Sequence, residues 1–567
     1  MRGRPGLLLV PLVAASAALR YWAASRIPSP WITPDEQTYA ELGRSLWRAG
    51  SFDILGHSTE PLSLVHPALI GIPLSAFGAE TGYAVAKALQ AVVMSLAAVP
   101  VYLWGRSLMR PRWALAAAAL TLASPGLVYT GFLMTEVAFY PVLVLVAWAM
   151  AAALEEPTLD RQALLLGTML LAFATRLQAV VLVPVLVLAL LLYAWLSPRA
   201  SNTVLLARRF VPLFGGIAAV AVVWSVLVLR GHRSASGLLG TYGAAAQGSY
   251  HAGSVVKFAL YHVGDLVLAT GVFAVVALAL LVARGRAETP GVRGFLAVTT
   301  ACAAGLVAEV GLFASRNLGR LGERYLLALA PLCFLALALW LDRGAPRPRA
   351  VTGLAGAAAL VLLAVLPSRF FGEAAAPDAP STVLVRDAFG GHVRLGLALA
   401  GAALLAALAL VPSRVVWALP VVAGALLVAG SVSASRFVER QARGYERVMV
   451  GQDRRWIDRF AKGPVLFVYS GEAAWSGGGP VWTNVFWNRR IDSVVRIGPA
   501  PVYGPIDAPV AHVGPGGRLL VGGLPVSPPY VVAASAWNVP GTLIAQGGGY
   551  VLWQPRGPVR LLRRPSS

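Results

Sequence analysis

The sequence predicts an α-helical polytopic membrane protein of about thirteen transmembrane helices, with a small extracytoplasmic α/β or β-rich domain at its C-terminal end. Three observations support this. Of the 567 residues, 57% are hydrophobic and 13% are charged, which excludes an ordinary soluble enzyme and equally a disordered chain. Apolar runs of about 20 residues, the length that crosses a bilayer core, recur up to residue 435. After residue 437 the apolar runs become short and are broken by Gly and Pro.

The apolar runs up to residue 435 are the predicted membrane spans. The first follows the basic segment Met1–Arg4, and because no convincing small-residue cleavage site comes after it, we expect an anchor rather than a signal peptide. The thirteen spans lie near residues 6–24, 83–105, 112–130, 135–154, 161–176, 179–197, 208–230, 257–284, 293–314, 325–342, 350–367, 394–413 and 415–435.

Charge predicts the orientation of these spans. With the N-terminus inside, five of the six inner loops are net basic, as the positive-inside rule requires. The net charge of +22 then largely reports topology, and nucleic acid is not expected as a partner. Anionic lipid or a phosphorylated lipid substrate is the other explanation of the basic excess. Residues 25–82 form the first outer loop, and everything after the last span is also outside.

Two domains follow from this division: a transmembrane domain over 1–436 and an extracytoplasmic domain over 437–567. Residues 436–461 are predicted to form a polar helix that leaves the membrane, followed by short strands. Cys302 and Cys333 both lie in apolar runs, so neither a disulfide framework nor a zinc site is supported.

The first outer loop carries the most informative motif, Pro-Asp-Glu-x-x-Tyr-Ala, in which Asp35 and Glu36 are adjacent. Residues 38–49 have the apolar spacing of an amphipathic helix that lies in the membrane interface. The two acids stand at its N-terminus, where capping and the helix dipole explain one of them. A second carboxylate so close to a bilayer favours a functional role. Residues 66–77 are too short to span and predict a second interfacial segment.

Ionisable residues inside or beside the later spans are the other candidates, because charge in a membrane is costly. Glu136, Asp265 and Glu309 fall in the outer third of their predicted helices. Basic residues face the same side, against the positive-inside rule, and guanidinium groups bind phosphate oxygens in bidentate fashion. These basic residues are Arg176, Lys257, Arg316, Arg320 and Arg324.

Several sequence motifs are missing. There is no Walker A loop, no Gly-x-Gly-x-x-Gly after a strand and no His-Glu-x-x-His. ATP-driven transport and zinc proteolysis therefore lose support. The residues fit a reaction in which a carboxylate deprotonates a hydroxyl that attacks a phosphate-activated carbon.

The Asp-Glu motif in a long first outer loop, two interfacial helices and a later Glu-Arg-Tyr before a Pro-containing span resemble the GT-C glycosyltransferases. The likeness is to the protein O-mannosyltransferase and aminoarabinose transferase type, and to actinobacterial wall arabinosyl- and mannosyltransferases, most specifically over residues 30–140 and 316–332. The Trp-Trp-Asp signature of oligosaccharyltransferases and a β-trefoil insert are missing.

The resemblance implies a polyprenyl-phosphate-linked monosaccharide donor, used on the outer side of a bacterial plasma membrane with inversion at the anomeric carbon. The acceptor hydroxyl would belong to a cell-wall glycan, a lipid or a protein. No cofactor is required, and a divalent metal stays an alternative. By motif, the resemblance implies that Asp35 is the general base, that Glu36 orients the sugar or the acceptor, and that Glu136 is the second acid of the pocket. It also implies a basic pocket without fixing each position, and we infer that the donor phosphate is bound by Arg176, Lys257, Arg320, Arg324 and Tyr325. We further expect the acceptor or sugar pocket to include Tyr39, His57 and His66.

Two other functions remain open from the sequence. A transporter or flippase of a lipid-linked sugar explains intramembrane charge equally well, but it should place polar groups near the middle of the bilayer rather than at its outer rim. A membrane scaffold whose exterior domain binds glycan is the other alternative.

Overall fold

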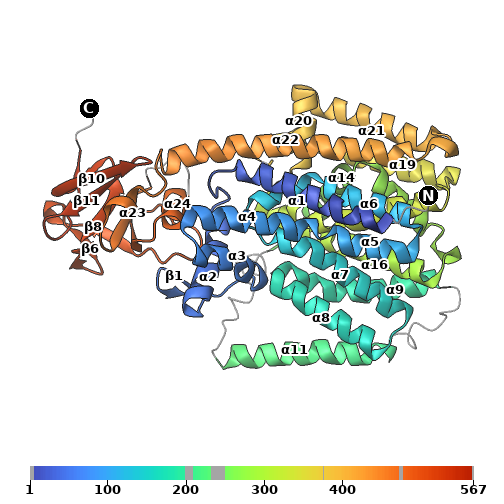
Figure 1. Cartoon of the computed structure of the whole chain (residues 1–567), viewed down its shortest axis with the longest axis horizontal. Helices are drawn as coiled ribbons and strands as arrows, with labels where there is room; N and C mark the ends of the chain where they lie inside the picture. Colours follow the sequence, from blue (N-terminus) through green and yellow to red (C-terminus); the bar gives the residue numbers. More distant parts are fainter. Residues whose placement is uncertain (1–4, 198–207, 231–248, 375, 472–476, 565–567) are drawn as a thin grey trace.

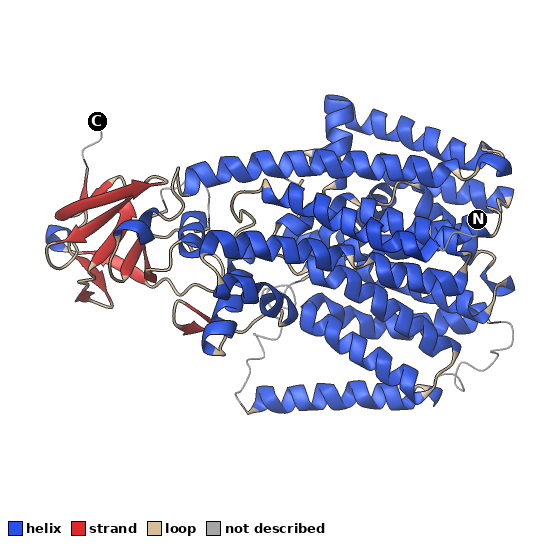
Figure 2. Cartoon of the chain, in the orientation of Figure 1, coloured by secondary structure: helices blue, strands red, loops and turns tan. Residues whose placement is uncertain are grey.

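A computed structural model describes residues 5–197, 208–230, 249–374, 376–471 and 477–564. It has two parts: a large bundle of roughly parallel helix axes and a compact β-rich domain at one end of that bundle (Figures 1 and 2). The long helix α22 (Ala418–Met449) runs along the bundle and leads directly into the β-rich domain (Figure 1). Helices α2 (Asp35–Ala49) and α3 (Val65–Ala76) lie at the same end (Figure 1). We call this the outer end, after the orientation that the sequence predicts.

Ten helices or helix pairs in the described part of the chain are long and apolar enough to cross a membrane, or eleven if the bent segment 111–131 counts as one span. Each of the thirteen predicted spans corresponds to a helical segment. Eleven of them match these candidate spans, and the other two, near 161–176 and 350–367, match the shorter helices α8 and α19. The chain is a multi-pass membrane protein, as predicted. The bundle helices are α1 (Leu9–Ser25), α4 (Ala79–Ser95), α5 (Ala98–Leu108), α6 (Pro111–Ala123), α7 (Glu136–Glu155), α8 (Leu159–Thr175), α9 (Leu182–Leu196), α11 (Val211–Leu229), α14 (Ala252–Ala269), α15 (Phe273–Val282), α16 (Pro290–Phe313), α17 (Glu323–Leu326), α18 (Ala330–Asp342), α19 (Arg349–Ala364), α20 (Ser381–Phe389), α21 (Val393–Leu410) and α22 (Ala418–Met449).

The segment expected as one span over 257–284 is broken into α14 and α15. Gly271 and Val272 both have a φ of 70°, a left-handed conformation that no helix continues through. Hydropathy is uniform across the break, so the sequence pattern did not reveal it. Helix α22 is also longer than expected, because it continues without interruption past residue 436 to Met449.

The first outer loop folds into α2 (Asp35–Ala49), a short hairpin of β1 (Asp53–Ile54) and β2 (His57–Ser58), and α3 (Val65–Ala76). Helices α2 and α3 cross at Gly43 and Gly71. A Cβ atom on Gly71 would lie 2.3 Å from the carbonyl oxygen of Gly43, so only glycine permits this approach. The two predicted interfacial helices are therefore present and packed on each other.

The outer domain contains an eight-stranded mixed sheet in the order β10-β11-β8-β3-β4-β5-β6-β7. Strand β3 is parallel to both β4 and β8, and the outer strands are antiparallel, which fits the predicted α/β or β-rich class. Its elements are α23 (Trp456–Phe460), β3 (Val465–Tyr469), α24 (Gly479–Trp487), β4 (Ile491–Ile497), β5 (Val510–Val513), β6 (Leu519–Val521), β7 (Leu524–Pro525), β8 (Tyr530–Ala534), β9 (Trp537–Asn538), β10 (Gly541–Gly547), β11 (Tyr550–Pro555) and β12 (Leu562–Arg563).

The first outer loop and the outer domain share a core. Leu42 and Ile54 are buried in the hydrophobic cluster of the domain. Beside them, Glu41 of α2 forms ion pairs with Arg44 of the same helix and with Arg489, at 3.1 Å from the latter. The domain therefore holds the loop that carries the Asp-Glu motif.

Candidate active site

Asp35 begins helix α2 at the outer end of the bundle, and its side chain is 43% exposed. Its carboxylate lies 3.7 Å from the guanidinium of Arg324. Loss of hydration raises the pKa of Asp35, Arg324 opposes that rise, and the nearby carboxylates of Glu136 and Asp378 add to it. Asp35 is thus an accessible carboxylate with a raised pKa, which suits a general base better than an ordinary aspartate does.

Arg324 stands at the centre of the site. It lies on the short helix α17, and besides Asp35 it contacts Asp378 at 3.2 Å and Glu136 at 4.0 Å. Its guanidinium also donates a hydrogen bond to the Tyr325 hydroxyl over 2.8 Å. One arginine therefore connects three carboxylates, of which only Asp35 is substantially exposed.

Glu136 and Arg176 form the buried side of the same cluster. Glu136 begins α7, shortly after the bent segment 111–131, and pairs with Arg176 at 3.1 Å. Arg176 follows the last residue of α8, and its guanidinium lies 4.9 Å from the centre of the Tyr325 ring. The ring also has the Arg324 guanidinium 4.8 Å from its centre. Four residues expected to share a site from the sequence, Glu136, Arg176, Arg324 and Tyr325, therefore meet in space.

Asp378 is a member of the cluster that the sequence analysis did not single out. Its carboxylate accepts a 2.6 Å hydrogen bond from Arg320, and its side chain is 7% exposed. The backbone N–H of Arg324 also donates to its carbonyl oxygen. A signal was available, because Asp378 is an acid between two prolines in an outer loop, but only the fold brings that loop to Arg324.

Glu36 points away from the cluster. It is completely buried and accepts backbone hydrogen bonds of 2.9 Å from Trp31, Ile32 and Leu133. Burial raises the pKa of Glu36 to about 7, although these three donors oppose the rise. The geometry gives Glu36 a positioning role, because it ties the turn before Asp35 to the segment before α7.

The three residues predicted for the acceptor or sugar pocket do not all lie together. The rings of Tyr39 and His66 are perpendicular at 5.6 Å, and His66 is completely buried. Neither ring nitrogen of His66 has a hydrogen-bond partner among the described residues. Burial lowers the pKa of His66 to about 4, so its ring is neutral at pH 7. His57 lies instead on the exposed hairpin, 3.8 Å from Asp507 of the outer domain.

Three further candidates lie outside the cluster. Lys257 is exposed on α14, with its ammonium 5.9 Å from the centre of the Tyr261 ring. Asp265 is buried, and neither of its carboxylate oxygens has a hydrogen-bond partner in the part of the chain that the structure describes. Glu309 lines a separate cavity of about 420 Å³.

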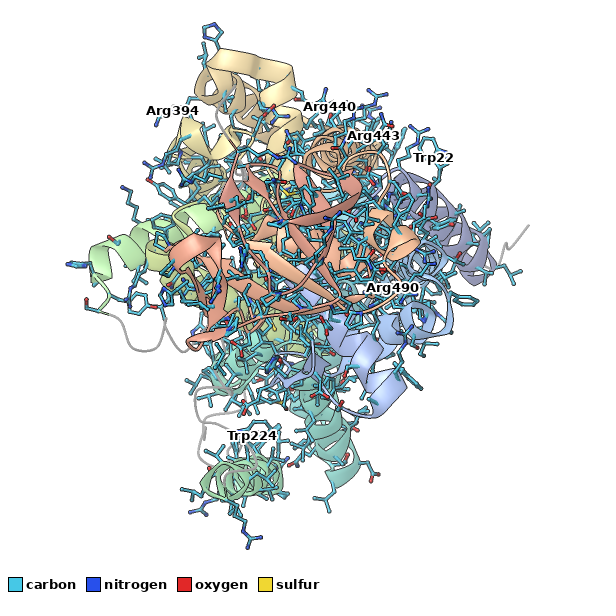
Figure 3. All side chains as sticks on the ribbon, turned by 90° about the vertical axis from the view of Figure 1, so that its left-hand side faces the viewer. Trp22, Trp224, Arg394, Arg440, Arg443 and Arg490 are labelled. Atoms are coloured by element: carbon cyan, nitrogen blue, oxygen red, sulfur yellow. The ribbon has the colours of Figure 1, made fainter. Side chains whose placement is uncertain are left out.

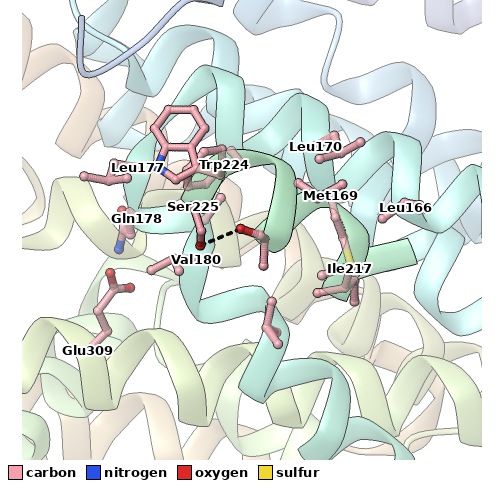
Figure 4. Close-up of a pocket in the computed structure, with 15 residues that line it drawn as sticks. Leu166, Met169, Leu170, Leu177, Gln178, Val180, Ile217, Trp224, Ser225 and Glu309 are labelled. Atoms are coloured by element: carbon pink, nitrogen blue, oxygen red, sulfur yellow. Dashed lines mark hydrogen bonds between the residues drawn. The ribbon is translucent and has the colours of Figure 1, made fainter. Parts of the chain in front are cut away.

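That cavity is apolar and lies among α8, α9, α11 and α16. In the close-up, Gln178 and Glu309 point toward one another at one side, while mostly apolar side chains line the rest, with the Ser225 hydroxyl bonded to the backbone of its own helix (Figure 4). The Gln178 amide donates a hydrogen bond to the carbonyl oxygen of Tyr325 over 3.2 Å. An apolar cavity therefore adjoins the arginine cluster through Gln178.

Among the residues that the structure describes, no three His, Cys, Asp or Glu side chains are grouped so that they could hold a metal ion. The acids of the cluster face arginines instead.

Comparison with known proteins identifies this architecture. No protein-family model matches the sequence, and no curated protein matches it significantly. Among solved structures, ArnT from Cupriavidus metallidurans in the apo state aligns over 97% of this chain and 98% of its own, with a TM-score of 0.56 and 16% identity. The chain has the ArnT fold. The same protein bound to undecaprenyl phosphate aligns equally completely, with a TM-score of 0.55 and 15% identity. The match spans both the bundle and the outer domain, and it confirms the predicted GT-C fold.

Proposed function

We propose that this protein is a membrane glycosyltransferase that moves a monosaccharide from a polyprenyl-phosphate donor to an acceptor hydroxyl, with inversion. The observation that carries the proposal is the position of Asp35: an accessible carboxylate beside Arg324, in the fold of a protein whose structure holds undecaprenyl phosphate. The proposed base and the proposed phosphate-binding arginine are thereby 3.7 Å apart.

In the proposed reaction, the acceptor oxygen forms a bond to the anomeric carbon while the bond from that carbon to the phosphate oxygen breaks. The acceptor proton passes to the Asp35 carboxylate, and the electron pair of the broken bond leaves with the phosphate. Arg324 and Arg176 stabilise the charge that develops on the leaving phosphate. Attack on the face opposite the phosphate produces inversion.

The apolar cavity supports a lipid donor. It offers hydrocarbon surface close to Arg176, and the isoprenoid chain of the donor needs such surface while its phosphate needs cations. A transporter places its polar groups near the middle of the membrane, whereas this cluster lies beside the interfacial helix α2 at the outer end. This position favours transfer.

The proposed location is a bacterial plasma membrane, with the site and the outer domain outside. The basic loops between spans support that orientation. Cell-wall glycan, lipid and protein remain the candidate acceptor classes. We propose that no cofactor or metal is required, and a chelator that left transfer unchanged would support this.

The test is an assay of the purified full-length protein with radiolabelled polyprenyl-phosphate mannose, arabinose or aminoarabinose and a membrane or cell-wall extract. The expected result is release of polyprenyl phosphate together with label in an acceptor. Movement of intact donor across vesicle membranes without bond cleavage would instead establish a flippase.

A further inference from the structure

Another cavity, lined mainly by charged side chains, lies on the flank of the outer end. It is bounded by the C-terminal end of α1, the first turns of α4, the last turns of α22 and the segment that follows α22. Its volume is about 460 Å³. Charged side chains dominate its lining: five are cationic and two are acidic. The cations are Arg26, Lys87, Arg443, Arg447 and Arg454, and the acids are Glu80 and Glu446.

The carboxylates near this cavity do not neutralise its cations. Arg454 pairs with Glu446, while Arg26 and Arg443 share Glu439, at 3.7 and 2.7 Å. Arg447 has no carboxylate partner in the described part of the chain. The cavity therefore has an excess of positive charge and free guanidinium donors, which is the composition of an anion site.

Lys87 strengthens this assignment because it is a buried cation. It is 3% exposed, its ammonium donates to the carbonyl oxygens of Ala24 and Ile27 over 3.0 and 2.8 Å, and the Tyr83 ring centre is 4.0 Å away. Carbonyl groups and a ring compensate a buried charge only in part. Among the described residues no carboxylate lies within ion-pair distance of Lys87, and Glu36 and Glu446 act on it only from farther away. An anionic ligand in the cavity would add to this incomplete compensation.

The edge of the cavity carries the marks of the membrane interface. Trp22 of α1 is 57% exposed, and the Arg26 guanidinium lies 3.9 Å from the centre of its ring. Exposed tryptophan at the end of a span is typical of the head-group region. Figure 3 shows Trp22 and Arg443 projecting from the same flank. The anion best suited to this position is the phosphate of a lipid rather than a soluble ion.

We propose that this cavity binds the phosphoryl head group of an anionic phospholipid, at a site separate from the Asp35 cluster. The two sites share no residue. Lys87 nevertheless holds the carbonyl of Ile27, and the chain from there runs through Ile32, which Glu36 binds, to Asp35. A bound lipid should therefore steady the segment that leads into helix α2. The proposal stands independently of glycosyl transfer.

The experiment uses the full-length protein in a neutral detergent, titrated with mixed micelles of phosphatidylglycerol or of phosphatidylcholine. Thermal unfolding and native mass spectrometry report lipid binding. The test variant is Arg447→Gln, because Arg447 is exposed and its loss leaves no carboxylate unpaired. Arg440→Gln is the matched control: an exposed arginine on the same helix that does not line the cavity.

We expect phosphatidylglycerol, and not phosphatidylcholine, to raise the unfolding temperature of the wild type and of Arg440→Gln. Arg447→Gln should bind phosphatidylglycerol about tenfold more weakly, which corresponds to one lost charged hydrogen bond. If Arg447→Gln does not fold, Arg26→Gln should show the same weakening. Equal binding by the Arg447 and Arg440 variants would overturn the site. If inorganic phosphate alone gave the full shift, the lipid assignment would be wrong.

Discussion

Replacing Arg324 by glutamine is the sharpest perturbation of the arginine cluster. Among the described residues, Arg324 is the one cation that lies 4.0 Å or less from all three carboxylates, Asp35, Glu136 and Asp378, and the change removes it. Arg176 still faces Glu136, and Arg320 still faces Asp378, so the variant retains part of the positive charge. The donor phosphate would then approach three carboxylates and two arginines, whereas in the wild type three arginines balance the three carboxylates.

The expected magnitude follows from the contacts that are lost. A hydrogen bond to a charged group contributes about 1.5–3 kcal/mol, and a guanidinium engages phosphate through two such bonds. Because the second bond adds less than the first in a shared geometry, we expect a total loss of about 3 kcal/mol, or roughly a hundredfold weaker donor binding. Lysine restores the charge but not the planar fork, so Arg324→Lys should recover about tenfold of that loss.

The assay is direct binding of radiolabelled polyprenyl-phosphate sugar to the purified variants, together with the acceptor KM from the transfer reaction. Arg110→Gln serves as the matched control, because Arg110 pairs with Asp342 at 2.5 Å at the opposite end of the bundle. Donor binding should fall in the Arg324 variant and not in the Arg110 variant, while the acceptor KM stays within about threefold of wild type. Unchanged donor affinity in Arg324→Gln would refute the phosphate role.

Three further predictions follow from the same geometry. On acidification, transfer should decline already at a pH above the usual aspartate pKa of about 3.9. The reason is that the base must be deprotonated and the pKa of Asp35 is raised. A pH–rate profile that is flat down to that value would contradict this. Glu36→Gln turns an amide N–H toward the Leu133 N–H and so leaves a buried donor unpaired. The variant should therefore lose about 1–3 kcal/mol of unfolding free energy, measured by thermal unfolding in detergent. Wild-type stability of the variant would contradict the anchoring role of Glu36. Arg489→Gln breaks the ion pair that joins the outer domain to Glu41 of α2. The variant should be cleaved faster by protease in the first outer loop, with unchanged donor affinity. Lost donor binding would place Arg489 in the site instead.

The sequence predicted the membrane architecture well, because length and hydropathy decide which segments cross a bilayer. It did not reveal the break at Gly271, since a change in φ at one point leaves the hydropathy of the segment unchanged. The full length of α22 was also missed, because the polar turns after residue 436 look like a separate element although the helix continues.

The candidate site was predicted in part. Asp35, Glu136, Arg176 and Arg324 were recognisable because charge is rare beside apolar spans, and the structure brings them together. The residue pattern alone could not separate Asp35 from its neighbour Glu36, and only the family resemblance assigned them different roles. Because adjacent residues of a helix point in different directions, the Asp35 side chain lies against Arg324, whereas the Glu36 side chain accepts hydrogen bonds from three backbone N–H groups. Lys257 was predicted for the site from its position along the chain, but it lies outside the cluster. Its side chain is exposed on α14, beside the Tyr261 ring.

The most direct test of the proposed function is donor turnover by Asp35→Asn, with Asp53→Asn as the control, because Asp53 lies in the same loop and contacts Ser51 rather than Arg324. Purified proteins are compared for binding of polyprenyl-phosphate sugar and for release of polyprenyl phosphate in the presence of acceptor. We predict that Asp35→Asn binds donor within about threefold of wild type and that its transfer falls by at least a hundredfold, as expected for loss of a general base, while Asp53→Asn stays active. Normal turnover by Asp35→Asn would contradict the assignment of Asp35 as the base.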